Sequence, residues 1–172
     1  MRDLYREQLS GLNQELIKMG AACEEIIALS SRALTDYSAS LAEKVSSVGA
    51  LIDESERTIE TTCLKLLLRQ QPVARDLRQI SAAMKMITDM ERIGDQAEDI
   101  VDLIPKMKRG GEENYPRIRE MAKAAQYMVT EAVNAYVKQD LDLARQVMDY
   151  DDVIDNYFNE IKTDILGFVA AN

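Results

Sequence analysis

The sequence of 172 residues contains no histidine and no tryptophan. Without histidine, the chain cannot build a Ser-His-Asp or Cys-His catalytic system, nor a metal site that uses imidazole. The ferritin-type di-iron arrangement is excluded as well, because its Glu-x-x-His motifs each need a histidine. Any chemistry in this chain therefore falls to carboxylates, hydroxyls, lysines or thiols.

Cysteine is also scarce, since Cys23 and Cys63 are the only two in the chain. They lack Cys-x-x-Cys spacing, and each lies among apolar residues at helical spacing, so neither a zinc site nor a disulfide framework is indicated. We expect both to be small buried side chains in a reducing cytosol.

The sequence also lacks targeting and membrane segments. No apolar run approaches the roughly 20 residues that span a bilayer. The N-terminus has no apolar region of the signal-peptide type and reads as the start of a helix. We therefore expect a soluble, cytoplasmic protein with no membrane insertion.

Glycine and proline, with 7 and 3 residues, are too few for the turns of a many-stranded β protein. Good helix formers such as Ala, Leu, Glu and Lys dominate instead. The chain has 30 acidic and 21 basic residues and a formal charge of -9. This balance argues against a nucleic-acid partner, because phosphate contacts need a basic surface.

Apolar residues recur at alternating steps of four and three, which predicts long amphipathic helices. Pro72 and Pro116 suit the first turn of a helix. Residues 108–114 read as a solvated loop. Long helices joined by short loops must be antiparallel neighbours, so the sequence predicts an all-α, antiparallel long-helix bundle. The expected helices cover about residues 5–36, 41–69, 72–104, 116–137 and 141–169.

Shifting the chain by 99 residues aligns its two parts and superposes both the apolar stripes and the turns. The shift also pairs Asp53 with Asp152, and Glu56 with Asp155. We interpret it as a duplicated three-helix unit, with residues 1–109 as the first unit and 116–172 as a second, incomplete unit of two helices. A bundle with an unpaired apolar face should associate, so we expect a homodimer or a higher oligomer.

The segment Glu91-Arg92-Ile93-Gly94-Asp95 is the most informative part of the chain. Glu91 continues the apolar stripe of its helix, and Asp95 lies one turn later on the same face. Gly94 costs about 1 kcal/mol in a helix interior relative to alanine. Its presence predicts that another backbone or a ligand comes close at this point.

The preceding helix offers a second acidic pair, Glu56 and Glu60, with Asp53 one turn earlier. These acids flank the apolar stripe, so antiparallel packing would let the two pairs face each other. Carboxylate oxygens alone suit hard cations such as ferric iron, manganese, magnesium or calcium. The alternative is an exposed acidic face that Arg57 and Arg92 neutralise as ordinary surface ion pairs. An enzyme that uses metal-bound water is a third alternative, although no nucleophile or oxyanion donor converges on these acids.

Two motifs in this order resemble the signature of the PhoU family of phosphate-signalling regulators: the 91–95 segment and the run Arg69-Gln70-Gln71-Pro72-Val73-Ala74-Arg75-Asp76-Leu77-Arg78. The opening helix, with Leu9, Leu12 and Met19-Gly20, is similar too. The resemblance covers the first unit almost entirely and continues more loosely to the last helix. It implies a duplicated three-helix bundle with a cytoplasmic, non-enzymatic role.

The resemblance further implies a function in phosphate homeostasis. Proteins similar to this one repress phosphate-starvation genes when phosphate is plentiful. They connect the ATPase subunit of the phosphate ABC transporter to a membrane sensor histidine kinase. The alternative function is a structural or metal-storing helical bundle without a signalling role.

Some members of the family bind a metal cluster through E(D)xxxD motifs on paired helices. Here those motifs fall on Glu91 with Asp95 and on Glu56 with Glu60, where Glu60 replaces the expected aspartate. The resemblance implies iron first, with manganese, magnesium or zinc as alternatives.

Asp53, Asp152 and Asp155 are weaker candidates. In the second unit, Asn159 stands where a second acid would follow Asp155. The second unit has no counterpart of the helix that carries residues 91–95. A complete second cluster would need a partner chain or the remainder of a truncated sequence.

Overall fold

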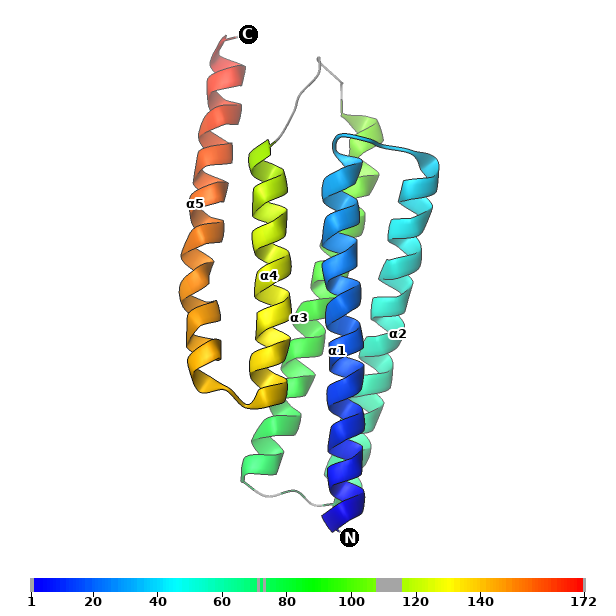
Figure 1. The fold of residues 1–172 in the computed structure, drawn as a ribbon. Coiled ribbons are helices and arrows are strands. Elements are labelled where there is room, and N and C mark those ends of the chain that lie inside the picture. Colours follow the sequence, from blue (N-terminus) through cyan, green and yellow to red (C-terminus); the bar gives the residue numbers. More distant parts are fainter. Residues whose placement is uncertain (1, 71, 73, 108–115, 172) are drawn as a thin grey trace.

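The computed structural model describes residues 2–70, 72, 74–107 and 116–171, and this part of the chain is helical with no strand (Figure 1). The expectation of an all-α antiparallel bundle is confirmed. The loop predicted at 108–114 lies outside the described residues. None of the described helices is both long and apolar enough to cross a membrane. The helices are α1 (Arg2–Ala33), α2 (Ala39–Gln70), α3 (Arg75–Leu103), α4 (Pro116–Lys138) and α5 (Leu141–Ala171), with a short 3₁₀ turn, η1 (Ile104–Lys106), after α3.

The turn between α4 and α5 shows why the two helices fold back on each other. Gln139 has a φ of 55°, and the N–H of Asp140 donates to the carbonyl oxygen of Ala135 at 2.9 Å, which closes the end of α4. The Asp140 carboxylate then accepts the N–H groups of Asp142 and Leu143 at 3.1 and 3.0 Å. One short segment therefore caps both helices.

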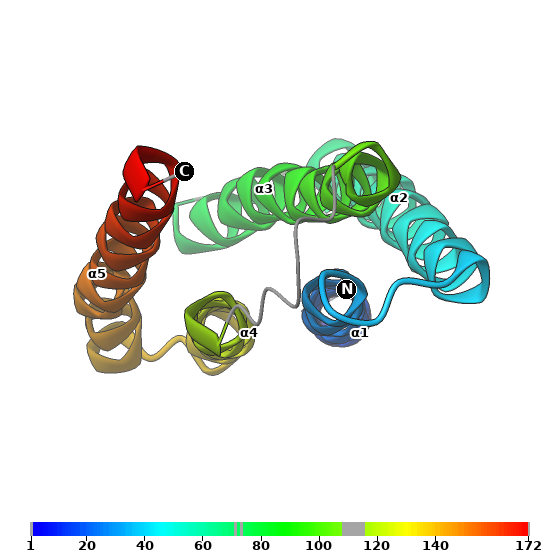
Figure 2. The ribbon, with the colours of Figure 1, turned by 90° about the horizontal axis from the view of Figure 1, so that it is seen from above.

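The hydrophobic core lies between α1, α2 and α3. Helix α4 packs against α1, and α5 packs mainly on α4, so α5 is the outermost helix (Figure 2). Val147 is the only buried residue among those described in α5. The largest fully buried side chains are Leu12, Leu16, Met19 and Ile26 of α1, Val45, Ile52, Ile59 and Leu66 of α2, and Ile80 and Ile87 of α3.

Both cysteines belong to this core, as expected, and both are free and buried. The Cys23 thiol donates a hydrogen bond to the carbonyl oxygen of Met90 at 3.5 Å. Burial raises the pKa of Cys23 to about 12 and that of Cys63 to about 11. The thiols are therefore protonated packing groups, far from the thiolate state that binds metals.

Two glycines lie where side chains of a neighbouring helix come close to the backbone. A Cβ on Gly94 of α3 would lie 3.2 Å from Cδ1 of Ile52 on α2, and a Cβ on Gly20 of α1 would lie 3.1 Å from Cγ2 of Val133 on α4. The close approach that Gly94 predicts is thus made by helix α2. A glycine fits at position 94 because the Ile52 side chain occupies the volume that a larger residue there would need.

Replacing Gly94 with leucine should lower the free energy of unfolding by about 1–3 kcal/mol, because overpacking forces α2 and α3 apart. Leucine is a good helix former, so helix propensity works in the opposite direction and cannot cause the loss. Urea denaturation measures the change. Gly11→Leu is the matched control, because nothing lies within 4 Å of a Cβ at Gly11. Equal stability of the two variants would contradict the packing role of Gly94.

Candidate metal centre

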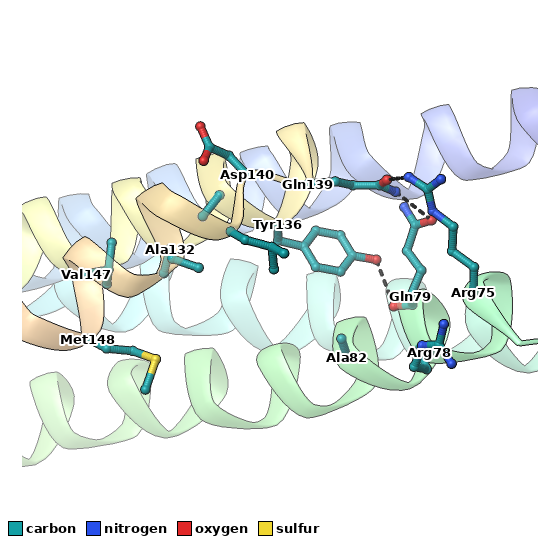
Figure 3. Close-up of a pocket in the computed structure, with 13 residues that line it drawn as sticks. Arg75, Arg78, Gln79, Ala82, Ala132, Tyr136, Gln139, Asp140, Val147 and Met148 are labelled. Carbon is teal, nitrogen blue, oxygen red and sulfur yellow. Dashed lines mark hydrogen bonds between the residues drawn. The ribbon is translucent and has the colours of Figure 1, made fainter.

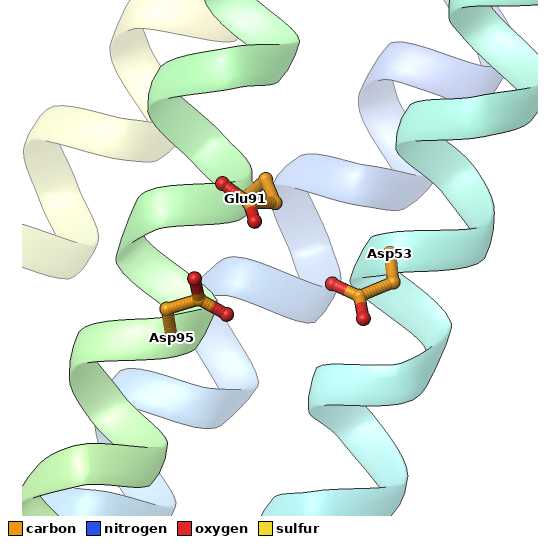
Figure 4. A group of neighbouring side chains, drawn as sticks. All are labelled: Asp53, Glu91 and Asp95. Atoms are coloured by element: carbon orange, nitrogen blue, oxygen red, sulfur yellow. The ribbon is translucent and has the colours of Figure 1, made fainter.

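Three carboxylates meet where α2 packs against α3: Asp53 of α2, and Glu91 and Asp95 of α3 (Figure 4). Each offers one oxygen, and these atoms all lie within 4.8 Å of one another. Asp53 and Glu91 are half-buried, whereas Asp95 is exposed. The group therefore lies at the rim of the core, with one side open to solvent. We call Asp53, Glu91 and Asp95 the carboxylate cluster.

The cluster follows directly from the glycine contact described above. Asp53 is the next residue after Ile52, and Asp95 is the next residue after Gly94. Because Ile52 rests against Gly94, the two aspartates emerge from the same point of the α2–α3 interface. Glu91 lies one turn before Asp95 on the same face and completes the group.

The structure brings together some of the predicted acids and separates others. Glu91 and Asp95 are together, as the sequence indicates, but their partner on α2 is Asp53, which had been a weaker candidate. Glu56 lies close enough for its charge to raise the pKa of Glu91. Glu60 is exposed one turn farther along α2, and its charge acts on Glu56.

The acids of the second unit lie elsewhere. Asp152 and Asp155 are exposed on α5. Neither belongs to the carboxylate cluster, which is formed by α2 and α3. Their correspondence in sequence to Asp53 and Glu56 is therefore not accompanied by a place in this cluster.

Repulsion and burial dominate the electrostatics of the cluster. Partial burial raises the pKa of Glu91, and the negative charges of Asp95 and Glu56 raise it further. Burial likewise raises the pKa of Glu56, helped by Glu60 and Asp53, while Arg57 acts to lower it. The guanidinium of Arg92, which the alternative of surface ion pairs assigns to these acids, lies 3.9 Å from the Asp89 carboxylate.

The donor set fits a hard cation. It consists of three carboxylates, with no imidazole or thiolate, and such oxygens suit iron(III), manganese or magnesium. Zinc fits less well, because its protein sites favour nitrogen and sulfur ligands. A cation would offset the repulsion among the three acids, and the open side leaves room for water ligands. Among the described residues, no ion pair that the structure shows involves the cluster.

A second feature is a cavity of about 490 Å³ between α3, α4 and α5 (Figure 3). Its walls are mostly apolar and include Ala82, Ala132 and Met148. At one end, the Tyr136 hydroxyl donates to the carbonyl oxygen of Gln79 at 2.9 Å, and Nε2 of Gln139 donates to Oε1 of Gln79 at 3.1 Å. Sequence reasoning missed this cavity, because small residues on three separate helices give no local signal.

The fold and the cluster together define a long-helix bundle with an oxygen-only candidate metal centre. The model of the PhoU domain matches residues 16–104 and 118–171, so the chain belongs to the PhoU family. This is a family of accessory and regulatory proteins and is not a known enzyme family. The two matched segments fall one in each predicted unit, while the boundaries of the duplication stay a prediction.

Several relatives are similar to nearly the whole chain. A protein of Clostridium acetobutylicum named phosphate-specific transport system accessory protein PhoU homolog is 32% identical, and the match covers 99% of this chain and 79% of that protein. The homolog of the same name in Pseudomonas aeruginosa is 30% identical, with 98% and 70% covered. The crystal structure of PhoU from Pseudomonas aeruginosa has a TM-score of 0.86 at 29% identity, and the match covers 98% of this chain and 81% of that one.

The raised pKa of Glu91 makes a prediction about pH. A carboxyl group whose pKa is higher in the folded state favours folding when protonated, so its contribution is lost as the pH rises through the folded value. Glu91→Gln should therefore stabilise the metal-free protein at pH 7, and the gain should shrink as the pH falls toward the ordinary glutamate value, near 4.5.

Urea unfolding of metal-free protein between pH 4.5 and 7.5 measures this gain. Glu54→Gln is the control, because Glu54 is exposed on α2 and lies outside the cluster. A Glu91→Gln effect that is the same at every pH, or that grows on acidification, would show that charge repulsion is not its cause.

Proposed function

We propose that this protein is a cytoplasmic regulator of phosphate uptake and of phosphate-starvation signalling, and that it acts as a metal-binding adaptor without enzymatic activity. Membership of the PhoU family carries the proposal, together with relatives named as accessory proteins of phosphate-specific transport along nearly the whole chain. In this role it represses phosphate-starvation genes indirectly when phosphate is plentiful.

The proposed partners are the ATPase subunit of the phosphate ABC transporter and a phosphate sensor histidine kinase. Helix α5 supplies a surface of the kind that protein partners use. Its side chains Phe158, Leu166 and Val169 are 56%, 59% and 66% exposed. Exposed apolar patches of this kind mark interaction sites. The same surface supports self-association as a homodimer or higher oligomer, which light scattering of the purified chain would detect.

The proposed metal role belongs to the carboxylate cluster. Asp53 would hold a hard cation from α2, and Glu91 and Asp95 would hold it from α3. The cation supplies positive charge and a cross-link between the two helices. The protein's own contribution is the fixed separation of its carboxylates, which the contact between Ile52 and Gly94 sets. Ligand binding to the folded state alone stabilises it, so metal would strengthen the α2–α3 pair.

The alternative function is a structural or metal-storing helical bundle without a signalling role. It is favoured by the fact that the three carboxylates of the cluster all come from one chain. Metal binding without any association with transporter or kinase would support this alternative over the adaptor.

Substitution of the cluster should remove the metal. Protein purified without chelator and reloaded with iron or manganese should contain metal by elemental analysis. Glu91→Gln combined with Asp95→Asn, or Asp53→Asn alone, should weaken binding about 10-fold or more, because each change removes ligand charge. The control is again Glu54→Gln. Metal content equal to that of the wild type in the double variant would mean that the cluster is not the site.

The adaptor role predicts a physical association. The purified protein should retain the transporter ATPase subunit and the sensor kinase in a pull-down, and Phe158→Ser should reduce the retained amount, because it removes exposed apolar surface on α5. Leu68→Ser is a matched control, since Leu68 is 80% exposed on α2.

Deletion of the gene should raise phosphate-starvation transcription under excess phosphate. No association with either partner, or an unchanged transcriptional response, would contradict the adaptor.

A further inference from the structure

A cavity of about 230 Å³ lies between α1 and α4, at the end of the bundle where α1 ends and α4 begins (Figure 1). It shares no lining residue with the larger cavity beside α5. Three basic side chains line it: Arg32 of α1, and Arg119 and Lys123 of α4. Within the part of the chain that the structure describes, none of its lining residues is acidic, although the chain has a formal charge of -9. We call this cavity the basic pocket.

The two helices build the basic pocket in the same way. Its walls are positions 28, 31, 32 and 35 of α1 and positions 119, 122, 123 and 126 of α4. Both sets have the same spacing of three and four residues, so each forms one face of its helix. Ala28 and Ala122 contribute only methyl groups to these faces, and the hollow between the basic side chains exists because both positions are small.

Hydrogen bonds between α1 and α4 fix one end of the basic pocket. Nε2 of Gln126 donates to the carbonyl oxygen of Glu24 at 3.0 Å. The Thr130 hydroxyl, one turn farther along α4, donates to the Glu24 carboxylate at 2.9 Å. The carboxylate of Glu24 is therefore engaged outside the pocket and does not neutralise the bases that line it.

Two of the bases have partners only on their own helices among the ion pairs that the structure shows in its described part. Arg32 lies 3.4 Å from the Asp36 carboxylate, and Lys123 lies 2.9 Å from that of Glu120. All four side chains are at least half exposed, and exposed pairs within one helix stabilise little. An anion in the pocket would contact bases from both helices at once, so it can replace these weak pairs.

We propose that the basic pocket binds a small molecule that carries a phosphate group. Each of its two arginines can donate a pair of parallel N–H bonds to phosphate oxygens. Lys123 adds a third positive charge, and the Ser31 hydroxyl supplies a further donor. The volume is below the roughly 300–1,000 Å³ of sites that enclose a drug-sized ligand, which favours a free phosphate ion or the phosphate end of a larger metabolite.

This site goes beyond the proposed function, and it depends neither on the metal centre nor on the adaptor role. A ligand held by both α1 and α4 would strengthen the contact between the two predicted units. Because it binds the folded state, it should also raise the melting temperature of the chain.

Calorimetric titration of the purified chain with inorganic phosphate, and separately with ATP, tests the proposal in 0.15 M NaCl, where scattered surface charges are largely screened. Arg32→Gln and Arg119→Gln should each weaken binding about 10-fold, because each removes charge-assisted hydrogen bonds to the anion. Arg145→Gln is the matched control. Like Arg32, Arg145 is an exposed arginine that pairs with an acid of its own helix, and it lies outside the basic pocket.

A second variant fills the basic pocket without a change of charge. Ala28 is exposed, so Ala28→Leu should keep the wild-type melting temperature while its side chain occupies the hollow and weakens binding about 10-fold or more. A diffuse positive surface would bind the anion equally well in this variant. Ala21→Leu is the control, because Ala21 is exposed on α1 and lies outside the pocket.

The two probes identify the form of the ligand. Binding of free phosphate, with the expected losses in the variants, identifies the ion itself. Binding of ATP alone, with the same losses, assigns the site to the phosphate group of a larger metabolite. A wild type that binds neither probe would overturn the proposal, as would wild-type affinity in Arg32→Gln and Ala28→Leu. None of these results depends on metal content or on the pull-down, so the proposals fail separately.

Discussion

The contact of Ile52 with Gly94 is the constraint on which the candidate site depends. With no side chain at position 94, α3 can lie against Ile52 of the neighbouring helix. The residues that follow each of them, Asp53 and Asp95, are then held at the same point of the interface. Like charges repel, so the acids do not bring the helices together. Burial of apolar side chains such as Ile52, Ile59 and Ile87 supplies the favourable free energy, and the cluster is held in spite of its charge.

This balance leaves the metal-free protein with an unfavourable charge density on one face. Partial burial raises the pKa values of Glu56, Glu91 and Glu98, and neighbouring acids raise them further. In the proposed metal role, a hard cation would offset the repulsion among these acids, so its binding would be coupled to the stability of the α2–α3 pair. The proposed docking surface on α5 is separate from this pair, since α5 packs mainly on α4 at the edge of the bundle (Figure 2). The proposed metal and partner roles therefore lie on different helices.

Much of the fold was predictable from local spacing. The stripe residues Leu12, Leu16 and Met19 are buried as their period indicates. Helix α4 ends at Lys138, where the polar residues of the following turn begin. Gly94 indicated a close approach, which the side chain of Ile52 makes. The choice of partner on α2 was not predictable. Asp53, Glu56 and Glu60 all flank one apolar stripe, and periodicity does not tell which flank meets α3 and which meets solvent.

The sequence by itself determined the helices, the acidic surface and, through the absence of histidine, a site restricted to oxygen ligands. These follow from composition and from residue spacing within one segment. Only the tertiary structure decided that Asp53 joins Glu91 and Asp95, that basic residues of α1 and α4 line one pocket, and that alanines of α3 and α4 line a cavity beside α5. The physical reason is that helical periodicity is a local property of one chain segment. The register and rotation of two helices depend instead on how the shapes of side chains distant in sequence fit together.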